Sequence, residues 1–246
     1  MITSWLMVIC TDPGTPPEEW QRQMTAAVAR GESVPICRRS GLYKPPRSHF
    51  DSVTERLTLN MDHFCPWVVN TVGFYNRKFF MLFLVYTNLT LFVCLISLVA
   101  QVAVMWDYLH REDVVRRWFP SIVNLVFYIG AIVIDALLML TLVPFTKYHL
   151  TMACHNETTL EGNTNSKYDV GVRHNLQSVF GRRLWTWPLP FYLHGPDGDG
   201  VHWPSIDRAP VRTSSSTTVV PRGRASEGVR TATDIDPRLP PEAAQP

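Results

Sequence analysis

Three residues in the first third of the chain carry side chains that together could move an acyl group. Asp62, His63 and Cys65 lie within four residues of one another, in the segment MDHFCPW. A cysteine becomes a nucleophile as the thiolate, which a neighbouring imidazole can generate by accepting the proton. A carboxylate beside the imidazole fixes its tautomer and favours its cationic form. These residue types are the ones that acyl transfer through sulfur requires.

The spacing of the three residues leaves open whether they form a catalytic or a structural cluster. Residues one or two apart on a regular helix point to different faces, so this cluster needs a bend if its side chains are to meet. Pro66 directly follows Cys65 and disfavours helix there, so we expect a bent loop. On local chemistry alone, such a cluster in a loop is more often structural than catalytic.

Two apolar blocks follow the cluster and predict membrane-spanning helices. Residues 79–106 contain no charged side chain and exceed the roughly 20 residues that a helix needs to cross the hydrocarbon core. Residues 121–145 form a second block, interrupted only by Asp135. The polar loop of residues 107–120 is too short to be a domain, so the two helices should form an antiparallel hairpin.

Asp135 lies near the middle of the second apolar block, where a charged group is costly. We expect it to be neutral or hydrogen-bonded. The first block carries Asn88, Thr90 and Ser97 at similar depth, and pairing with one of them is favoured over a functional site.

The basic residues predict the orientation of the hairpin, because lysine and arginine accumulate on the cytosolic side of a membrane. The short loop carries three arginines, and both flanks carry more basic residues. We therefore expect an integral protein of the endomembranes (ER or Golgi) or the plasma membrane, with both termini cytosolic and the loop luminal. The basic residues of the flanks are Arg47, Arg56, Arg77 and Lys78 before the hairpin, and Lys147, Lys167, Arg173, Arg182 and Arg183 after it.

Composition excludes several classes of protein. A formal net charge of +2 over 246 residues gives no reason to expect a nucleic-acid partner. The stretch from residue 205 onward is rich in Ser, Thr, Pro, Arg and Gly, which predicts a disordered tail. The cysteines form no close pair, which argues against a disulfide framework and against a zinc site of CxxC spacing. They are Cys10, Cys37, Cys65, Cys94 and Cys154.

Four short segments carry a resemblance to a known family. KPPRSH begins at Lys44, and MDHFCPWVVNTVGFYNRKFF begins at Met61. After the second apolar block come TTLE at residues 158–161 and NLQSVFG at residues 175–181. These segments resemble the cysteine-rich domain, the following span, the TTxE motif and a C-terminal motif of the DHHC protein S-acyltransferases.

The resemblance implies a palmitoyltransferase that works through a thioester intermediate. Cys65 would take a fatty acyl group from acyl-CoA, such as palmitoyl-CoA, and pass it to cysteines of cytosolic or membrane-attached proteins. His63 would act as the base, and Asp62 would orient it. Acyl-CoA, the substrate proteins and the lipid bilayer are then the expected partners, with no bound cofactor. The alternative is a catalytically inactive membrane scaffold or regulator related to the same family.

The chain departs from the family in its zinc ligands. Two zinc ions hold the family's loop, each through three cysteines and one histidine. Too few of these ligands remain for a four-ligand site, so we predict no structural zinc. We expect packing of Phe50, Leu57 and Phe64 to substitute for it. The aligned positions are occupied by Cys37, Ser40, Phe50, Asp51, Thr54, Leu57, Phe64 and Thr71.

The expected architecture is an α-helical integral membrane protein built on a two-helix transmembrane hairpin. The family usually has four spans, and the first residues of this chain resemble the end of the second. The expected order is an N-terminal segment (1–35) that is a remnant of an upstream span, a DHHC-like irregular catalytic loop domain (36–78), a transmembrane helix (79–106), a luminal loop (107–120), a transmembrane helix (121–145), a cytosolic C-terminal region (146–204) and a disordered tail (205–246).

Overall fold

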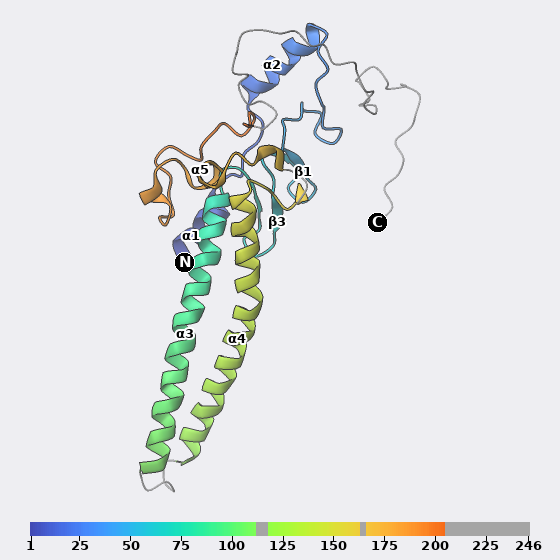
Figure 1. Cartoon of the computed structure of the whole chain (residues 1–246). Coiled ribbons are helices and arrows are strands. Elements are labelled where there is room, and N and C mark those ends of the chain that lie inside the picture. Colours follow the sequence, from blue (N-terminus) through green and yellow to red (C-terminus); the bar gives the residue numbers. More distant parts are fainter. Residues whose placement is uncertain (112–117, 163–165, 205–246) are drawn as a thin grey trace, which may run out of the picture.

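Two long helices dominate the computed structural model, which describes residues 1–111, 118–162 and 166–204. Helix α3 (Arg77–Arg111) and helix α4 (Trp118–Cys154) run antiparallel, and the rest of the described chain gathers at one end of this hairpin as a head (Figure 1). Each contains a stretch that is long and apolar enough to cross a membrane, Arg77–Trp106 and Val123–Cys154. The predicted pair of helices able to span a membrane is therefore present.

The helices are longer than the apolar blocks from which they were predicted. Helix α3 continues to Arg111 and α4 begins at Trp118, so both ends of the predicted loop at residues 107–120 are helical instead. Helix α4 also continues past Pro144 to Cys154, although Pro144 has no backbone N–H to donate to the preceding turn. Residues 112–117 and the predicted disordered tail, residues 205–246, lie outside the described residues.

The segment predicted as an irregular loop domain contains two small antiparallel hairpins. Strand β1 (His49–Asp51) pairs with β2 (Arg56–Thr58), and β3 (His63–Cys65) pairs with β4 (Asn70–Val72). Phe50 lies opposite Leu57 in the first hairpin, and Phe64 opposite Thr71 in the second. The segment expected to be irregular therefore contains these four short strands, and most of its other residues lie outside helices and strands. Three-residue strands leave little periodicity for a sequence to display.

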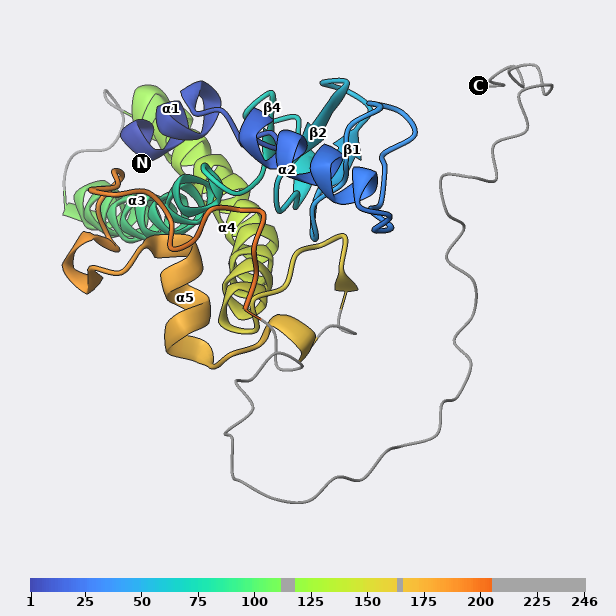
Figure 2. The same cartoon turned by 90° about the horizontal axis from the view of Figure 1, so that it is seen from above.

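Helix α1 (Ile2–Cys10) supports the second hairpin and lies beside α3 (Figure 2). Its Val8 is fully buried in an apolar cluster with Cys65, Val68, Val72 and residues of α3. The side-chain amide of Asn70 donates to the backbone carbonyls of Val8 (2.9 Å) and Ile9 (3.2 Å) at the end of α1. The N-terminal segment thus holds the hairpin that contains Cys65.

Helix α2 (Glu18–Ala29) packs on the opposite side of the head from the hairpin of long helices (Figure 1). Trp20 joins a buried cluster with Leu59, Phe74 and Val201. Gln21 binds the backbone of Tyr43 twice, donating to its carbonyl and accepting from its N–H, each at 2.9 Å. These contacts fix α2 to the segment that precedes β1.

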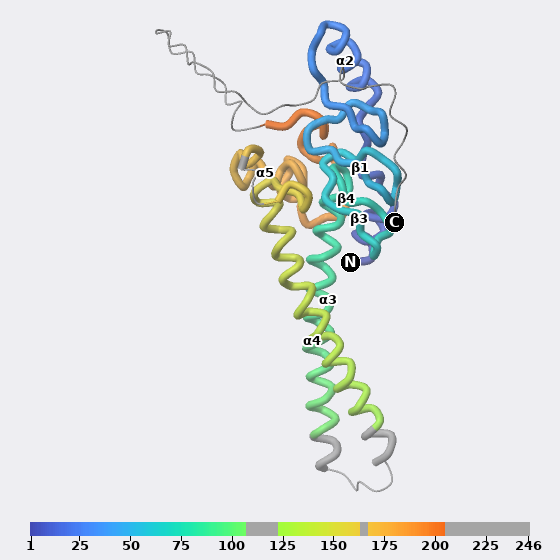
Figure 3. Tube along the Cα trace, turned by 90° about the vertical axis from the view of Figure 1, so that its right-hand side faces the viewer, coloured from blue at the N-terminus to red at the C-terminus, as the bar shows by residue number. Residues whose placement is uncertain are grey.

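The segment after α4 returns to the head and packs beside the long helices (Figure 3). It contains the short helix η3 (Ser166–Tyr168), helix α5 (Val172–Phe180) and the short helix η4 (Leu184–Thr186). Lys78, fully buried at the start of α3, donates to the carbonyls of Thr186 (2.8 Å) and Phe191 (2.7 Å). Its ammonium also lies 4.7 Å from the ring centroid of Tyr192. This lysine ties α3 to the C-terminal segment.

The expected partners of Asp135 do not pair with it. Asn88 donates to the hydroxyl of Thr146 (2.7 Å), whereas Thr90 and Ser97 donate to carbonyls of their own helix. The bond from Asn88 to Thr146 links the two helices at a level about three turns of α4 from Asp135. Among the described residues, neither carboxylate oxygen of the buried Asp135 has a hydrogen-bond partner.

Candidate active site

Strand β3 brings His63 and Cys65 together. Residues i and i+2 of a strand point to the same face, so these two side chains lie on one side of the hairpin and Phe64 on the other. We expected a bend to bring these side chains together, and an extended strand does so instead. The expected turn follows directly, with the N–H of Val68 donating to the carbonyl of Cys65 (3.3 Å).

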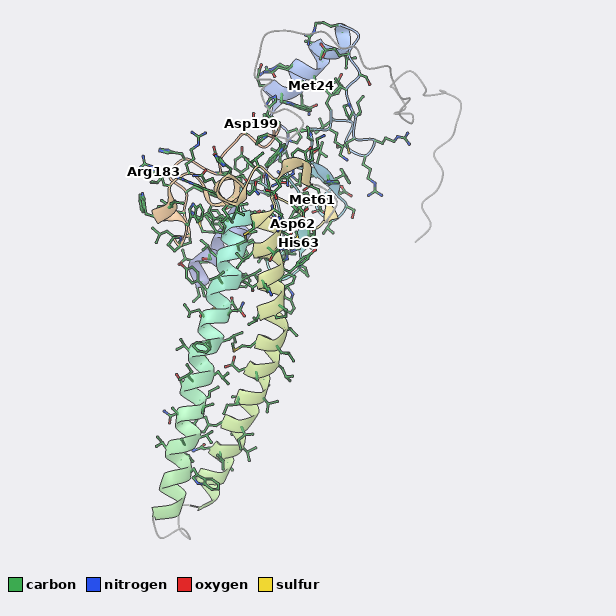
Figure 4. All side chains as sticks on the ribbon, viewed as in Figure 1. Met24, Met61, Asp62, His63, Arg183 and Asp199 are labelled. Atoms are coloured by element: carbon green, nitrogen blue, oxygen red, sulfur yellow. The ribbon has the colours of Figure 1, made fainter. Side chains whose placement is uncertain are left out.

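Asp62 lies immediately before β3 and is fully buried. Its Oδ2 lies 2.7 Å from Nδ1 of His63, which makes this imidazole nitrogen the hydrogen-bond donor to the carboxylate. The other oxygen, Oδ1, accepts from the backbone N–H of Thr159 (3.0 Å) and lies 3.8 Å from the guanidinium of Arg77. Figure 4 shows Asp62 and His63 together where α4 meets the head.

The surroundings of this pair shift both of its pKa values. Burial raises the pKa of Asp62, but the hydrogen bond from His63 and the charge of Arg77 outweigh burial and lower it to about 2. Burial lowers the pKa of His63, but its hydrogen bonds with Asp62 and Cys65 outweigh burial and raise it to about 9. At neutral pH, His63 is therefore an imidazolium beside an ionised carboxylate.

Cys65 is buried, and its thiol faces the imidazole of His63. Burial raises the pKa of the thiol, whereas the hydrogen bond with His63 and the backbone N–H groups of Trp67 and Val68 lower it, so that the net pKa falls below its ordinary value. A cysteine activated in this way is the form that attacks a thioester. Trp67, two residues further on, is one of the most exposed large side chains of the described chain.

His149 is a neighbour of the site that the sequence analysis missed. It lies on α4, is almost fully buried, and its Nδ1 is 3.6 Å from Oδ2 of Asp62 without forming a hydrogen bond. Its ring centroid lies 4.5 Å from that of Phe145 and 5.2 Å from that of Phe80. The only signal in the sequence is a histidine about one helical turn beyond the second apolar block.

The TTLE motif brings a second element to the site. The hydroxyl of Thr159 donates to the backbone carbonyl of Asp62, in addition to the bond that its N–H makes to the carboxylate. Glu161, in the same motif, forms a bidentate ion pair with Arg47, with Nε to Oε1 at 2.7 Å and Nη2 to Oε2 at 2.8 Å. Arg47 also donates to Oδ1 of Asn156 (2.8 Å) and lies 4.2 Å from a ring centroid of Trp203.

The fourth motif, NLQSVFG, joins α5 to the end of α4. Asn175, in α5, is fully buried and donates to the carbonyl of Cys154 at the end of α4 (2.7 Å) and to Asp169 (2.6 Å). The TTLE motif thus contacts both Asp62, through Thr159, and the KPPRSH segment, through Glu161, whereas the fourth segment contacts the end of α4.

Asp62, His63 and His149 are also the one group of described residues whose ligand atoms lie close enough for a metal ion, within 4.8 Å of one another. Tetrahedral zinc with ligand distances of about 2.0 Å keeps ligand atoms about 3.3 Å apart. The 2.7 Å between Asp62 and His63 is instead a hydrogen-bond distance. This group is better described as a hydrogen-bonded cluster than as a metal site.

Comparison with known proteins identifies a family to which the sequence is similar. The sequence model of the DHHC palmitoyltransferase family matches residues 32–166, more than half of the chain. "Probable protein S-acyltransferase 12" of Arabidopsis thaliana is 33% identical over 208 residues, which cover 78% of this chain and 69% of that protein. "Palmitoyltransferase ZDHHC15" of Homo sapiens is 30% identical over 204 residues, which cover 76% of this chain and 57% of that protein.

The chain belongs to the DHHC palmitoyltransferase family. The family predicted from the sequence is confirmed, and with it the predicted class of function and of enzyme, protein S-acyltransferase. The two long apolar helices agree with a membrane protein of this family. The roles of the individual site residues remain predictions.

Proposed function

We propose that Asp62, His63 and Cys65 form the catalytic triad through which this protein transfers a fatty acyl group from acyl-CoA to cysteines of other proteins. One observation carries the assignment: the imidazole of His63 lies between a buried carboxylate, 2.7 Å away, and the thiol of Cys65 on the same strand face. Nucleophile, base and orienting group are thus in contact, as nucleophilic catalysis requires.

In the first step, the Cys65 thiolate attacks the carbonyl carbon of the acyl-CoA thioester. A bond forms between that carbon and Sγ of Cys65, and the bond to the sulfur of coenzyme A breaks. His63, which begins as an imidazolium, gives its proton to the departing sulfur. The products are an acylated Cys65, free coenzyme A and a neutral imidazole.

In the second step, the neutral imidazole of His63 accepts the proton of the acceptor cysteine. The acceptor sulfur attacks the acyl carbon, and the bond to Sγ of Cys65 breaks. Cys65 leaves as a thiolate beside the imidazolium, so the resting pair is restored. Asp62 remains ionised throughout and holds Nδ1 of His63 in the donating tautomer.

The location of the triad suits a substrate with one end in the membrane and the other in water. Cys65 packs against Phe79 and Phe80 at the start of α3, close to where the apolar helices begin. Burial of a lipid chain is worth about 0.8 kcal/mol per methylene group, which favours an acyl tail that stays in the bilayer. With the head on the cytosolic side, as the basic flanks predict, the thiol can reach both this tail and cysteines of cytosolic or membrane-attached proteins.

A two-stage transfer assay tests this proposal. The purified full chain is incubated in detergent with alkyne-tagged palmitoyl-CoA and then with a peptide that contains one cysteine. We expect a hydroxylamine-sensitive adduct on the protein that passes to the peptide. Cys65→Ser should abolish both stages, whereas Cys94→Ser, at an exposed position in α3, should retain them. Transfer that survives Cys65→Ser would refute the assignment.

A further inference from the structure

The positions that the resemblance assigns to zinc ligands offer few groups that bind zinc. Of these positions, only Cys37 and Asp51 carry a thiol or a carboxylate, whereas structural zinc takes four ligands. Neither residue belongs to a group of three close His, Cys, Asp or Glu ligand atoms within the described part of the chain. The residues present therefore do not fit the zinc ions of the family.

Asp51 instead accepts a full set of hydrogen bonds. It ends strand β1 and is buried, with 3% of its surface exposed. Its Oδ1 accepts from the backbone N–H of Val53 (2.9 Å), and its Oδ2 accepts from the hydroxyls of Thr54 (2.8 Å) and Thr71. A buried carboxylate needs such donors, and hydrogen bonds to a charged group are the strong ones.

The bond from Thr71 links the two hairpins. Asp51 and Thr54 belong to the β1–β2 hairpin, whereas Thr71 lies in β4 and is fully buried. Thr71 is paired with Phe64 across the second hairpin, and Phe64 lies between His63 and Cys65 in β3. The carboxylate of Asp51 thus reaches across to the hairpin that carries the candidate nucleophile and base.

Apolar packing at the other aligned positions is less complete. Leu57 is 1% exposed, but Phe50 and Phe64 are only partly buried. Of the three residues expected to pack in place of zinc, only Leu57 is therefore fully buried, whereas the polar cluster of Asp51, Thr54 and Thr71 forms a link that was not predicted.

We propose that the cluster of Asp51, Thr54 and Thr71 is a metal-free cross-link that replaces zinc in this protein and joins the two hairpins. Three of the aligned ligand positions carry one acceptor and two hydroxyl donors, which hydrogen-bond directly to one another. The cross-link holds β4, and through it β3. The cross-link itself is independent of activity. Its role in keeping His63 and Cys65 in place for catalysis rests on the function proposed above.

Hydrogen exchange and metal analysis test the cross-link without relying on activity. The full chain is purified in detergent, its zinc content is measured by inductively coupled plasma mass spectrometry, and exchange of the amides of residues 49–72 is followed with and without EDTA. We expect substoichiometric zinc and no effect of EDTA. Thr71→Val and Asp51→Asn should speed exchange in this segment by about tenfold or more, because each breaks a charged hydrogen bond.

Thr25→Val is the matched control, since the hydroxyl of Thr25 is exposed on α2 and donates only to the carbonyl of Gln21 (3.0 Å). Stoichiometric zinc whose removal by EDTA speeds exchange would overturn the proposal, and so would exchange in Thr71→Val that matches the control. If hydrogen exchange responds as expected but neither the parent nor any variant forms an acyl adduct, the result supports the cross-link and refutes the proposed function.

Discussion

Thr159 holds Asp62 at two points, although 97 residues separate them in the sequence. Its backbone N–H donates to the carboxylate (3.0 Å), and its hydroxyl donates to the backbone carbonyl of Asp62. The first bond stabilises the negative charge of the Asp62 carboxylate, which His63 faces. The second bond fixes the backbone of Asp62. The TTLE motif thereby influences the candidate nucleophile, Cys65, indirectly: Thr159 positions Asp62, and Asp62 positions His63.

Thr159→Val should slow formation of the acyl adduct about fivefold, since the loss of one hydrogen bond is worth about 1 kcal/mol and displaces Asp62. Single-turnover labelling with tagged palmitoyl-CoA measures the rate. Thr158→Val is a close control, because the Thr158 hydroxyl is buried and has no hydrogen-bond partner among the described residues. Equal rates in the two variants would contradict this role of Thr159.

The reactivity of Cys65 towards iodoacetamide should depend on pH differently in the folded and the denatured chain. The pKa of the folded thiol is lowered and that of His63 is raised to about 9, so the thiolate and imidazolium coexist at neutral pH. We expect half-maximal alkylation at a lower pH in the folded chain. Asp62→Asn should move this midpoint upward, because the imidazolium loses its carboxylate. A midpoint equal to that of the denatured chain would contradict the ion pair.

The same shifts set the pH dependence of stability. The pKa of His63 rises from 6.5 to about 9 on folding, so its contribution is complete below about pH 6.5 and is lost as pH rises through about 9. The pKa of Asp62 falls from 3.8 to about 2, so its contribution is present above about pH 3.8 and is lost as pH falls through about 2. The midpoint temperatures of thermal unfolding of the parent and of His63→Gln should converge above about pH 9. A constant difference across that range would contradict the raised pKa.

Glu161→Ala should destabilise the head strongly, by about 3–5 kcal/mol, because it leaves Arg47 as an unpaired buried charge. The side chains of this pair are 1% and 7% exposed. Those of Arg30 and Glu32 are 63% and 56% exposed at the same 2.7 Å separation, so Glu32→Ala should cost about 0–1 kcal/mol. Denaturant unfolding followed by tryptophan fluorescence compares the two variants. Similar losses in both would show that burial of the Arg47 pair is unimportant.

The sequence predicts the two long helices well because an uncharged run of membrane length has few other interpretations. It also predicts Asp62, His63 and Cys65 as a group, because their residue types suit acyl transfer and the segments around them resemble the DHHC family. It predicts their arrangement poorly, since a three-residue strand such as β3 has no periodicity to detect, and a strand places His63 and Cys65 on one face without any bend.

Contacts between residues far apart in the chain could not be predicted from the sequence. Asp135 was expected to pair with Asn88, Thr90 or Ser97, but the register between α3 and α4 depends on the packing of whole helices, and none of the three residues bonds to it. His149 gave no signal other than its residue type, because its approach to Asp62 depends on how α4 meets the head. The bond between Asp51 and Thr71 joins two hairpins whose docking no local pattern describes.

The central claim is that His63 activates Cys65 for attack on acyl-CoA, and mapping the acyl adduct tests it most directly. The full chain is incubated with tagged palmitoyl-CoA, and tandem mass spectrometry identifies the modified cysteine and its rate of labelling. We predict that the tag resides on Cys65 and that His63→Ala slows its appearance by about 10²- to 10⁴-fold, because the Cys65 thiolate loses its imidazolium partner and the departing sulfur loses its general acid. A tag on another cysteine, or an unchanged rate in His63→Ala, would contradict the mechanism.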